Sequence, residues 1–341
     1  MKKLIVLLIA LCLFGCKESI ESKLSKLGYS QKDIEIIETY PENIQELFLS
    51  KYEYPYIKLM YTDGFDPNKL EEYMNYYGQM EADEIIAMVN GDDGDLADLY
   101  NNEYYLKKNK DIYLQYLDKY NGDIRRCIEE VNTKTYLDYY TDVQETDTSK
   151  NYLMLVNKYY GVPRDYVPDD LVEVEPHYGR GYLRSEVYEQ YKKLQDEANE
   201  LGYYFTICSA YREYAMQEAL YNGYLQEDAG GVASVDTYSA RPGHSEHHTG
   251  LCMDLYEATY GMDDFGLSEA SKWVNENCYK YGFIIRYTKE KEHITGYQAE
   301  PWQLRYVGSS EIAKDIMDRG ITFDEYYACF VEEWKKRIRK T

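Results

Sequence analysis

The hydrophobic pattern changes near residue 148, and this change limits the folds open to the 341-residue chain. Before it, apolar residues recur at helical spacing in short stretches. After it, helical stretches are interspersed with short strand-like runs such as residues 251–256 and 283–287, in an order that is not a regular βαβ repeat. We therefore expect an α+β protein: a domain over residues 149–341 with a small antiparallel sheet flanked by helices, preceded by a small all-helical domain over residues 16–148.

Two helices have readable start signals. Ser30 and Asp33 have the spacing of a capping box, in which each side chain bonds the backbone of the other residue. Ser185 is expected to cap a second helix, which Gly202 ends. The expected buried stripe of that helix consists of Val187, Tyr191, Leu194, Ala198 and Leu201.

The charge balance excludes one class of partner. The chain has 38 Lys and Arg against 61 Asp and Glu, a formal net charge of −23. A nucleic-acid binder needs a basic surface for the phosphate backbone, so we expect no nucleic-acid partner. The same balance argues against electrostatic docking onto anionic lipid.

The N-terminus resembles an export signal. Met1-Lys2-Lys3 is followed by an apolar run over residues 4–15, which is shorter than the about 20 residues that cross a membrane. The run ends in Gly15-Cys16 and resembles the lipobox of bacterial lipoproteins. This implies a lipoprotein signal peptide over residues 1–15, lipidation at Cys16 and an extracytoplasmic protein anchored to the bacterial cell membrane. An ordinary signal peptide with a chance cysteine is the alternative.

Histidine is concentrated in the C-terminal region, where all five residues lie at or after position 177. His247 and Asp254 can face one point if a turn at residues 249–250 leads into a strand that carries the aspartate. An imidazole and a carboxylate are a common beginning of a catalytic zinc site, which also needs a third ligand and a carboxylate that is not a ligand. Clustered histidines in a polar loop are also often only solvated.

Several ordered motifs resemble one family. Ser209-Ala-Tyr-Arg212, the stretch 241–254 and Glu300-Pro-Trp-Gln-Leu-Arg-Tyr-Val-Gly308 look like the VanY-type D-alanyl-D-alanine carboxypeptidases, which are zinc peptidases. The resemblance covers roughly residues 152–327.

The resemblance implies a role for each matching residue. It implies that His247 and Asp254 bind zinc, that Glu300 is the catalytic acid and base, and that Arg212 stabilises the developing oxyanion. This division of labour is the one that metal-assisted peptide hydrolysis requires.

The same resemblance implies a substrate. Ser209 and Ser245 are expected to line the substrate site, and one zinc ion is the expected cofactor. The expected partner is a peptidoglycan stem peptide of the cell wall ending in D-Ala-D-Ala, from which the hydrolase removes the C-terminal D-Ala.

One position departs from the family pattern. The pattern has a third histidine ligand where this sequence has Gln303, whose neutral amide is a much poorer zinc ligand than imidazole. Three outcomes are open at this position. Gln303 coordinates the zinc weakly or leaves its place to water, or one of three histidines (His293, His244 or His248) replaces it as the ligand. In the third outcome, the site holds no metal. The last case makes the protein a metal-poor pseudoenzyme that binds wall peptides without turnover. A third possibility is an interaction protein whose helical domain holds a partner.

Overall fold

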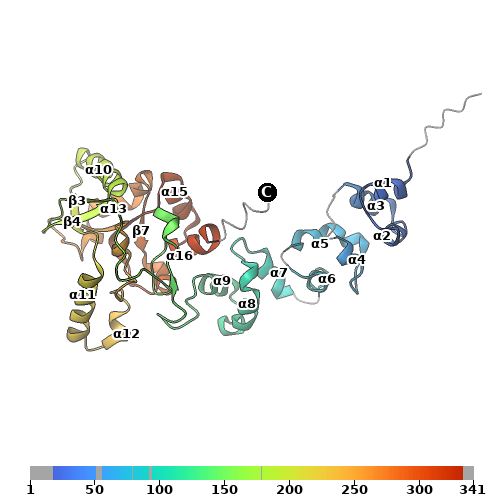
Figure 1. Cartoon of the computed structure of the whole chain (residues 1–341), viewed down its shortest axis with the longest axis horizontal. Helices are drawn as coiled ribbons and strands as arrows, with labels where there is room; N and C mark the ends of the chain where they lie inside the picture. Colours follow the sequence, from blue (N-terminus) through green and yellow to red (C-terminus); the bar gives the residue numbers. More distant parts are fainter. Residues whose placement is uncertain (1–17, 51–55, 79, 92–93, 178, 333–341) are drawn as a thin grey trace, which may run out of the picture. The chain divides into compact units, whose positions relative to one another are not determined.

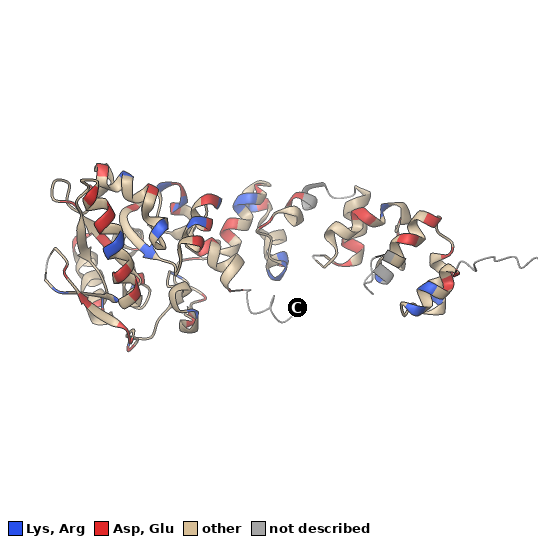
Figure 2. Ribbon diagram, turned by 90° about the horizontal axis from the view of Figure 1, so that it is seen from above, with Lys and Arg blue, Asp and Glu red and all other residues tan. Residues whose placement is uncertain are grey.

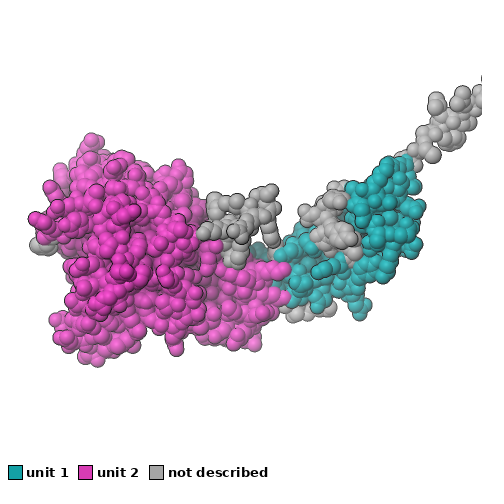
Figure 3. Space-filling view, viewed as in Figure 1, with its two compact units in different colours: residues 1–103 teal, residues 104–341 magenta. Residues whose placement is uncertain are grey.

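The computed structural model describes residues 18–50, 56–78, 80–91, 94–177 and 179–332. The chain divides into two compact units, residues 1–103 and 104–341 (Figure 3). Cys16 and the expected signal peptide lie outside the described residues, so the predictions made for them stay predictions.

The first unit is helical throughout its described residues. Its helices are α1 (Ile20–Lys26), α2 (Gln31–Ile37), α3 (Glu42–Ser50), α4 (Tyr56–Met60), α5 (Leu70–Tyr76), α6 (Ala82–Asn90) and α7 (Gly94–Asn101). Fully buried apolar side chains from three of them, Leu24, Ile34 and Phe48, belong to one core. The capping box is confirmed, because Ser30 Oγ accepts from the Asp33 amide and the Asp33 carboxylate accepts from the Ser30 amide.

Two helix pairs repeat the same internal hydrogen bond. In the first unit, Tyr73 Oη on α5 donates to Asn90 Oδ1 at the end of α6, 3.2 Å away. In the second unit, Tyr113 on α8 (Lys110–Tyr116) donates to Asn132 at the end of α9 (Ile124–Asn132). Each tyrosine also accepts a backbone amide proton, from Asp66 and Leu106 respectively. The two helix pairs therefore share one local hydrogen-bond pattern.

A four-stranded antiparallel sheet organises the second unit, which confirms the predicted α+β class. Its strands are β5 (Thr206–Ser209), β6 (Cys252–Tyr256), β8 (Glu300–Tyr306) and β7 (Phe283–Tyr287), in that spatial order. Two small sheets pair β1 (Gln144–Glu145) with β2 (Tyr160–Gly161) and β3 (Leu171–Val174) with β4 (Gly181–Arg184).

The α-helices that follow β4 complete the second unit (Figure 1). They are α10 (Ser185–Glu200), α11 (Tyr214–Glu227), α12 (Gly231–Val235), α13 (Glu269–Asn277), α14 (Glu292–Thr295), α15 (Ser310–Arg319) and α16 (Phe323–Tyr326). Leu194 of α10 and Val274 of α13 share one core with Met253 and Leu304 of the central strands. Ile284 of β7 belongs to a separate core with α15 and α16. Layering of this kind holds the sheet rigid beneath the polar residues that it carries.

The strand register places three polar residues side by side. Ser209 pairs with Asp254, and Asp254 pairs with Gln303 on the next strand. Directly paired residues of an antiparallel sheet present their side chains on the same face. The sheet therefore forms a row of a hydroxyl, a carboxylate and an amide across three strands.

The compact units divide between α7 and α8, rather than near residue 148 where the sequence pattern changes. The helix pair α8–α9 belongs to the second unit, although it is built like the helices before it. Ion pairs hold it there, because Lys291 Nζ lies 3.1 Å from Glu129 on α9 and 3.2 Å from Glu325 on α16. Long-range contacts of this kind leave no trace in local periodicity.

The expectation for α10 was wrong for Ser185 and Leu201, while Gly202 ends the helix as expected. Arg184 occupies the N-cap position, and Ser185 is the first helical residue, so its hydroxyl does not cap the helix. At the other end, Leu201 is 58% exposed, because the helix ends at Glu200 and the chain then turns at Gly202 with a positive φ of 87°. The four earlier residues of the predicted stripe are buried, as helical periodicity predicts.

Acidic residues, red in Figure 2, occur on helices of both units. This distribution agrees with the net charge of −23. Among the described residues, no helix has the length and apolarity needed to span a membrane.

Candidate active site

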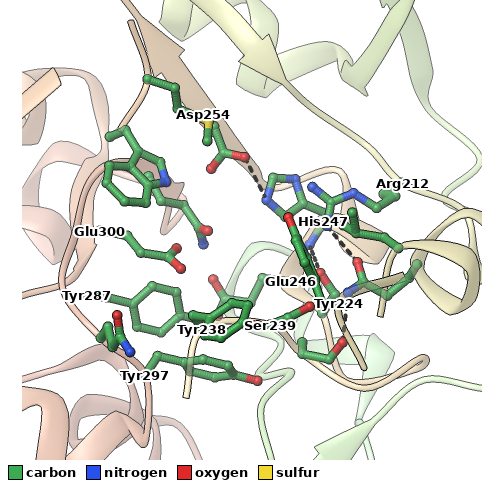
Figure 4. A pocket seen from close by; sticks show the side chains of 18 of the residues that line it. Arg212, Tyr224, Tyr238, Ser239, Glu246, His247, Asp254, Tyr287, Tyr297 and Glu300 are labelled. Atoms are coloured by element: carbon green, nitrogen blue, oxygen red, sulfur yellow. Dashed lines mark hydrogen bonds and ion pairs between the residues drawn. The ribbon is translucent and has the colours of Figure 1, made fainter. Parts of the chain in front are cut away.

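A cavity of about 290 Å³ lies over the row of polar residues on the sheet (Figure 4). Its lining includes most of the residues to which the sequence assigned a role: Arg212, Ser245, His247, Asp254, Glu300 and Gln303. Ser209 is not among the lining residues, but it contacts the site through Arg212. The structure thus brings together residues that are up to about 90 positions apart in the chain.

His247 and Asp254 meet as the sequence predicts. A 3₁₀ turn over Glu246–Thr249 ends at Gly250, whose φ of 65° favours glycine and turns the chain into β6. The turn positions His247 Nε2 3.3 Å from Asp254 Oδ2, and Figure 4 marks this contact. Ser245 accepts the His247 amide proton at 3.4 Å, so its hydroxyl supports the turn.

The arrangement of this pair fits a cation. His247 Nδ1 lies 2.6 Å from the Ala210 carbonyl, which can only accept, so Nδ1 carries a proton and Nε2 is the ring nitrogen left for a metal ion or a second proton. His247 Nε2 faces a carboxylate oxygen of Asp254, and the other oxygen, Asp254 Oδ1, is buried without a hydrogen-bond partner. Two electron-rich groups turned toward each other are stable with a proton or a metal ion between them.

The pKa of Asp254 reflects the same contacts. Burial alone would raise it, but the charge and hydrogen bond of His247, the Arg212 guanidinium and the Ser209 hydroxyl together bring it below its ordinary value. Asp254 therefore stays ionised, which is the form in which a carboxylate binds a metal.

Gln303 is the neighbouring donor. It is buried, lines the cavity and pairs with Asp254 across the sheet. Its side-chain amide oxygen is therefore available to the same cation, although an amide attracts zinc far less than imidazole does. Among the described residues, no group of three His, Cys, Asp or Glu side chains is placed to hold a metal.

The three histidines considered as substitutes do not line the cavity. His248 uses both ring nitrogens, because Nε2 accepts from the Gly243 amide at 3.0 Å and Nδ1 lies 2.6 Å from the Arg212 carbonyl. His244 Nδ1 lies 2.7 Å from the Asn157 carbonyl. His293 is on α14, where its Nε2 lies 3.7 Å from a Glu129 oxygen. All three support the fold around the site instead.

Glu300 begins β8 and enters the cavity from the side opposite Arg212 (Figure 4). Desolvation of its carboxyl group and the negative charge of Asp254 raise the pKa of Glu300 well above its ordinary value, against the opposing charges of Arg212 and Arg286. A carboxyl group with a raised pKa can both take up and release a proton near neutral pH.

Arg212 is held in a fixed direction. Its Nη2 donates to Ser209 Oγ at 2.9 Å, and its Nη1 donates to Gln217 Oε1 at 2.6 Å. Its backbone amide donates to the carbonyl of His247 at 3.1 Å, which ties it to the predicted metal-binding turn. A guanidinium has five N–H donors, so others remain for a ligand.

A buried ionic network next to the site was not predicted. Glu246 Oε1 lies 2.9 Å from Arg286 Nε and 2.7 Å from Arg305 Nη1, and Arg286 Nη1 lies 2.7 Å from Asp324 on α16. All four side chains are nearly or fully buried, so the network fixes the turn that carries His247 against β7 and β8. The only sequence signal was the position of Glu246 beside His247.

Aromatic side chains form another part of the cavity lining. Tyr224, Tyr238, Tyr287, Tyr297 and Trp302 all line it. Within this set, the rings of Tyr287 and Tyr297 lie 5.0 Å apart. Such a wall gives a bound ligand apolar contact and excludes water from the polar groups.

The part of the chain that holds the site matches a known protein family. The family model for VanY, the D-alanyl-D-alanine carboxypeptidases, matches residues 180–309, which include every residue that lines the cavity. YodJ of Bacillus subtilis, which is named as a carboxypeptidase, is 39% identical over 204 residues, covering 55% of this chain and 74% of the relative. The chain belongs to the VanY family. This family consists of zinc peptidases that act as D-Ala-D-Ala carboxypeptidases. As a member of the family, the chain is a carboxypeptidase acting on peptidoglycan peptides.

Two solved structures resemble this VanY-family chain. The LdcB LD-carboxypeptidase, reported with the basis of its peptidoglycan recognition, is 38% identical, has a TM-score of 0.51 and is matched over 55% of this chain and 91% of its own. A D,D-pentapeptidase VanY from a VanB-type resistance cassette is 31% identical, has a TM-score of 0.45 and is matched over 51% of this chain and 98% of its own. That protein was solved in complex with Zn(II).

Proposed function

We propose that this VanY-family protein is an exported, lipid-anchored D,D-carboxypeptidase that removes the terminal D-Ala of peptidoglycan stem peptides. One observation carries the proposal: His247, Asp254, Glu300 and Arg212 converge on a single cavity. The set contains a cation-binding pair, a carboxyl group with a raised pKa and a cationic donor. Hydrolysis of a peptide bond with the help of a metal needs these three elements.

Each residue has a task in this reaction. His247 and Asp254 would hold the ion, with Gln303 as the third and weakest donor. A bound zinc supplies Lewis-acid polarisation of the scissile carbonyl. Glu300 takes the proton of the attacking water and delivers a proton to the leaving amine of D-Ala. Arg212 donates to the oxygen on which negative charge develops.

The choice between D,D and L,D specificity needs a direct assay. We expect the mature chain, purified in detergent, to release D-Ala from a pentapeptide ending in D-Ala-D-Ala when zinc is supplied. A tetrapeptide with a single terminal D-Ala is the matched substrate. The similarity to the LdcB LD-carboxypeptidase favours the tetrapeptide as the second candidate. Faster release from the tetrapeptide would overturn the D,D assignment and retain a carboxypeptidase.

Gln303 favours another candidate, a wall-peptide binding protein without turnover. An amide in place of imidazole weakens the metal site while Arg212 and the aromatic lining remain. In the same assay this candidate predicts binding of the pentapeptide, measured calorimetrically, and no release of D-Ala at any zinc concentration.

Lipid anchoring is a separate part of the proposal, supported by Gly15-Cys16 at the end of an apolar run. We expect Cys16→Ser to release the protein from the membrane fraction or to block its processing. Cys127→Ser, which alters a buried thiol far along the chain, is the control. Unchanged membrane retention together with an unchanged mature mass would contradict the anchoring.

A further inference from the structure

A buried lysine lies behind the cavity and has no role in the reaction described above. Lys158 precedes β2 and is only 1% exposed. No carboxylate among the described residues lies within ion-pair distance of its Nζ. The Asp236 carboxylate, for example, is occupied by Arg241 at 2.7 Å and by the Tyr221 hydroxyl at 2.7 Å. Buried ammonium groups are normally paired, so this one requires another explanation.

The explanation is an aromatic cage. The Lys158 Nζ atom lies 3.6 Å from the ring centroid of Tyr297, 4.8 Å from that of Tyr139 and 5.3 Å from that of Tyr140. It also donates a hydrogen bond to the backbone carbonyl of Asp236. Ring faces attract cations most strongly where water is excluded.

The lysine side chain passes directly beneath Gly296. A Cβ atom added at Gly296 would lie 2.5 Å from Lys158 Cε, and the φ of this glycine is 71°. The backbone of this segment therefore closes around the lysine, and no larger residue fits there.

Two of the groups that Lys158 contacts, the Asp236 carbonyl and the Tyr297 ring, belong to segments that lead into the cavity lining. Asp236 leads into Tyr238, Ser239 and Ala240, and Tyr297 leads into Gln298, Ala299 and Glu300. The two segments also bond each other directly, because the Gln298 amide donates to the Thr237 carbonyl at 2.8 Å. Lys158 is thus the one buried cation, among the described residues, that contacts both segments.

The two segments lead to both parts of the catalytic machinery. The Ala240 carbonyl accepts from Gln217 Nε2 at 2.7 Å, and the same Gln217 side chain accepts from Arg212. On the other segment, Glu300 follows Tyr297 by three residues. A displacement of either segment would therefore move Arg212 or Glu300 relative to the cavity.

We propose that Lys158 is a positioning residue of the carboxypeptidase site. Its caged ammonium links segment 236–240 to segment 296–300 and thereby keeps Arg212 and Glu300 at fixed positions relative to each other. The proposal rests on the proposed function for its kinetic consequence, but not for its structural one. Burial lowers the pKa of Lys158 to about 7, with Arg241 acting in the same direction and Asp236 and Glu300 opposing it. The charge is therefore costly to keep, which agrees with a need for the cage.

The test uses Lys158→Met in the full mature chain, because methionine keeps the apolar stem and loses the ammonium. We expect amide hydrogen exchange in segments 236–240 and 296–300 to become about tenfold faster or more. With the pentapeptide, kcat should fall about 10–100-fold while KM changes less, as when a group that orients a catalytic residue is removed.

Lys291→Met is the matched control. Lys291 is also largely buried, with its side chain 12% exposed, but it pairs with Glu129 and Glu325 away from the cavity. The Lys291→Met variant should leave amide hydrogen exchange in segments 236–240 and 296–300 at the wild-type rate. Unchanged exchange in Lys158→Met, or the same acceleration in Lys291→Met, would overturn the proposal.

A second variant keeps the test valid if Lys158→Met does not fold. Tyr139 is 38% exposed and does not line the cavity, so Tyr139→Leu removes one ring of the cage at little cost to the core. It should accelerate exchange in the same two segments by a smaller factor. The hydrogen-exchange measurement does not depend on catalysis. An inactive wild-type protein would therefore contradict the proposed function, while hydrogen exchange alone would still decide the proposal about Lys158.

Discussion

The two sides of the cavity hold their carboxyl groups in opposite ways. On the sheet, Asp254 lies against His247 and the Arg212 guanidinium, and its pKa is lowered. At the start of β8, Glu300 is desolvated and faces the charge of Asp254, and its pKa is raised. In the reaction proposed above, the ionised carboxyl group binds the cation and the other exchanges a proton. Environments that move two pKa values apart divide the roles of metal ligand and acid–base group.

The sides also differ in completeness. The acid–base group Glu300 is present, and Arg212 across the cavity has the hydrogen bonds that orient it. The metal side has two strong donors and then Gln303, where the family resemblance leads us to expect imidazole. We infer that substrate orientation and proton transfer are intact and that metal affinity limits the activity.

The largest effect is expected on the acid–base side. Glu300→Gln removes the proton acceptor and should lower kcat for D-Ala release about 10²–10⁴-fold. Glu290→Gln, at an exposed position before β8, is the control and should keep the wild-type rate. Normal turnover by Glu300→Gln, measured with the zinc-loaded protein, would remove Glu300 from its assigned role.

Arg212→Ala should have the next largest effect. Loss of a donor to the developing oxyanion costs about 10²–10³-fold in kcat. Steady-state kinetics should place the loss mainly in kcat, and the exposed Arg180→Ala should show no loss. A change in KM alone would mean that Arg212 binds the substrate and does not stabilise the transition state.

A smaller gain is expected from completing the metal side. Gln303→His adds imidazole beside Asp254 and should raise zinc affinity by about 10–100-fold or more, together with activity at limiting zinc. Gln298→His is the matched control, because Gln298 also lines the cavity but lies outside the row of paired residues. Equal gains from both variants would mean that any added histidine suffices.

The smallest effect concerns stability of the metal-stripped protein. The pKa of Glu300 is raised in the folded state, so the stability linked to its protonation is lost as pH rises. At about pH 8 the ionised Glu300 destabilises the fold, and Glu300→Gln should therefore raise Tm by about 2–4 °C. Because the pKa of Asp254 is lowered, its contribution is present above the ordinary value and lost as pH falls, so Asp254→Asn should lower Tm at about pH 8. Melting curves with the same sign for both would contradict the comparison.

Local signals predicted much of this fold. Residues 283–287 form a strand with the expected bounds, and the capping box at Ser30 is present, because both depend on neighbouring residues. The pairing of His247 with Asp254 was also readable, since the two residues are seven positions apart and are joined by a turn and the start of a strand.

Other features depend on contacts between distant segments. Lys158 gives no local sign that it meets Tyr297, and Glu246 gives none that it pairs with Arg286 and Arg305. The same reason explains the division of the compact units, because Glu129 reaches Lys291 across the fold. Only the folded structure supplies such partners.

The zinc content of the wild-type protein tests the central claim most directly. Elemental analysis of the purified mature chain, before and after a mild chelator, gives the ratio of zinc to protein. We expect less than one zinc per chain and complete loss to the chelator, because His247 and Asp254 are the two strong donors and Gln303 is a weak third. One tightly held zinc per chain that survives the chelator, and that Gln303→His does not alter, would contradict the account.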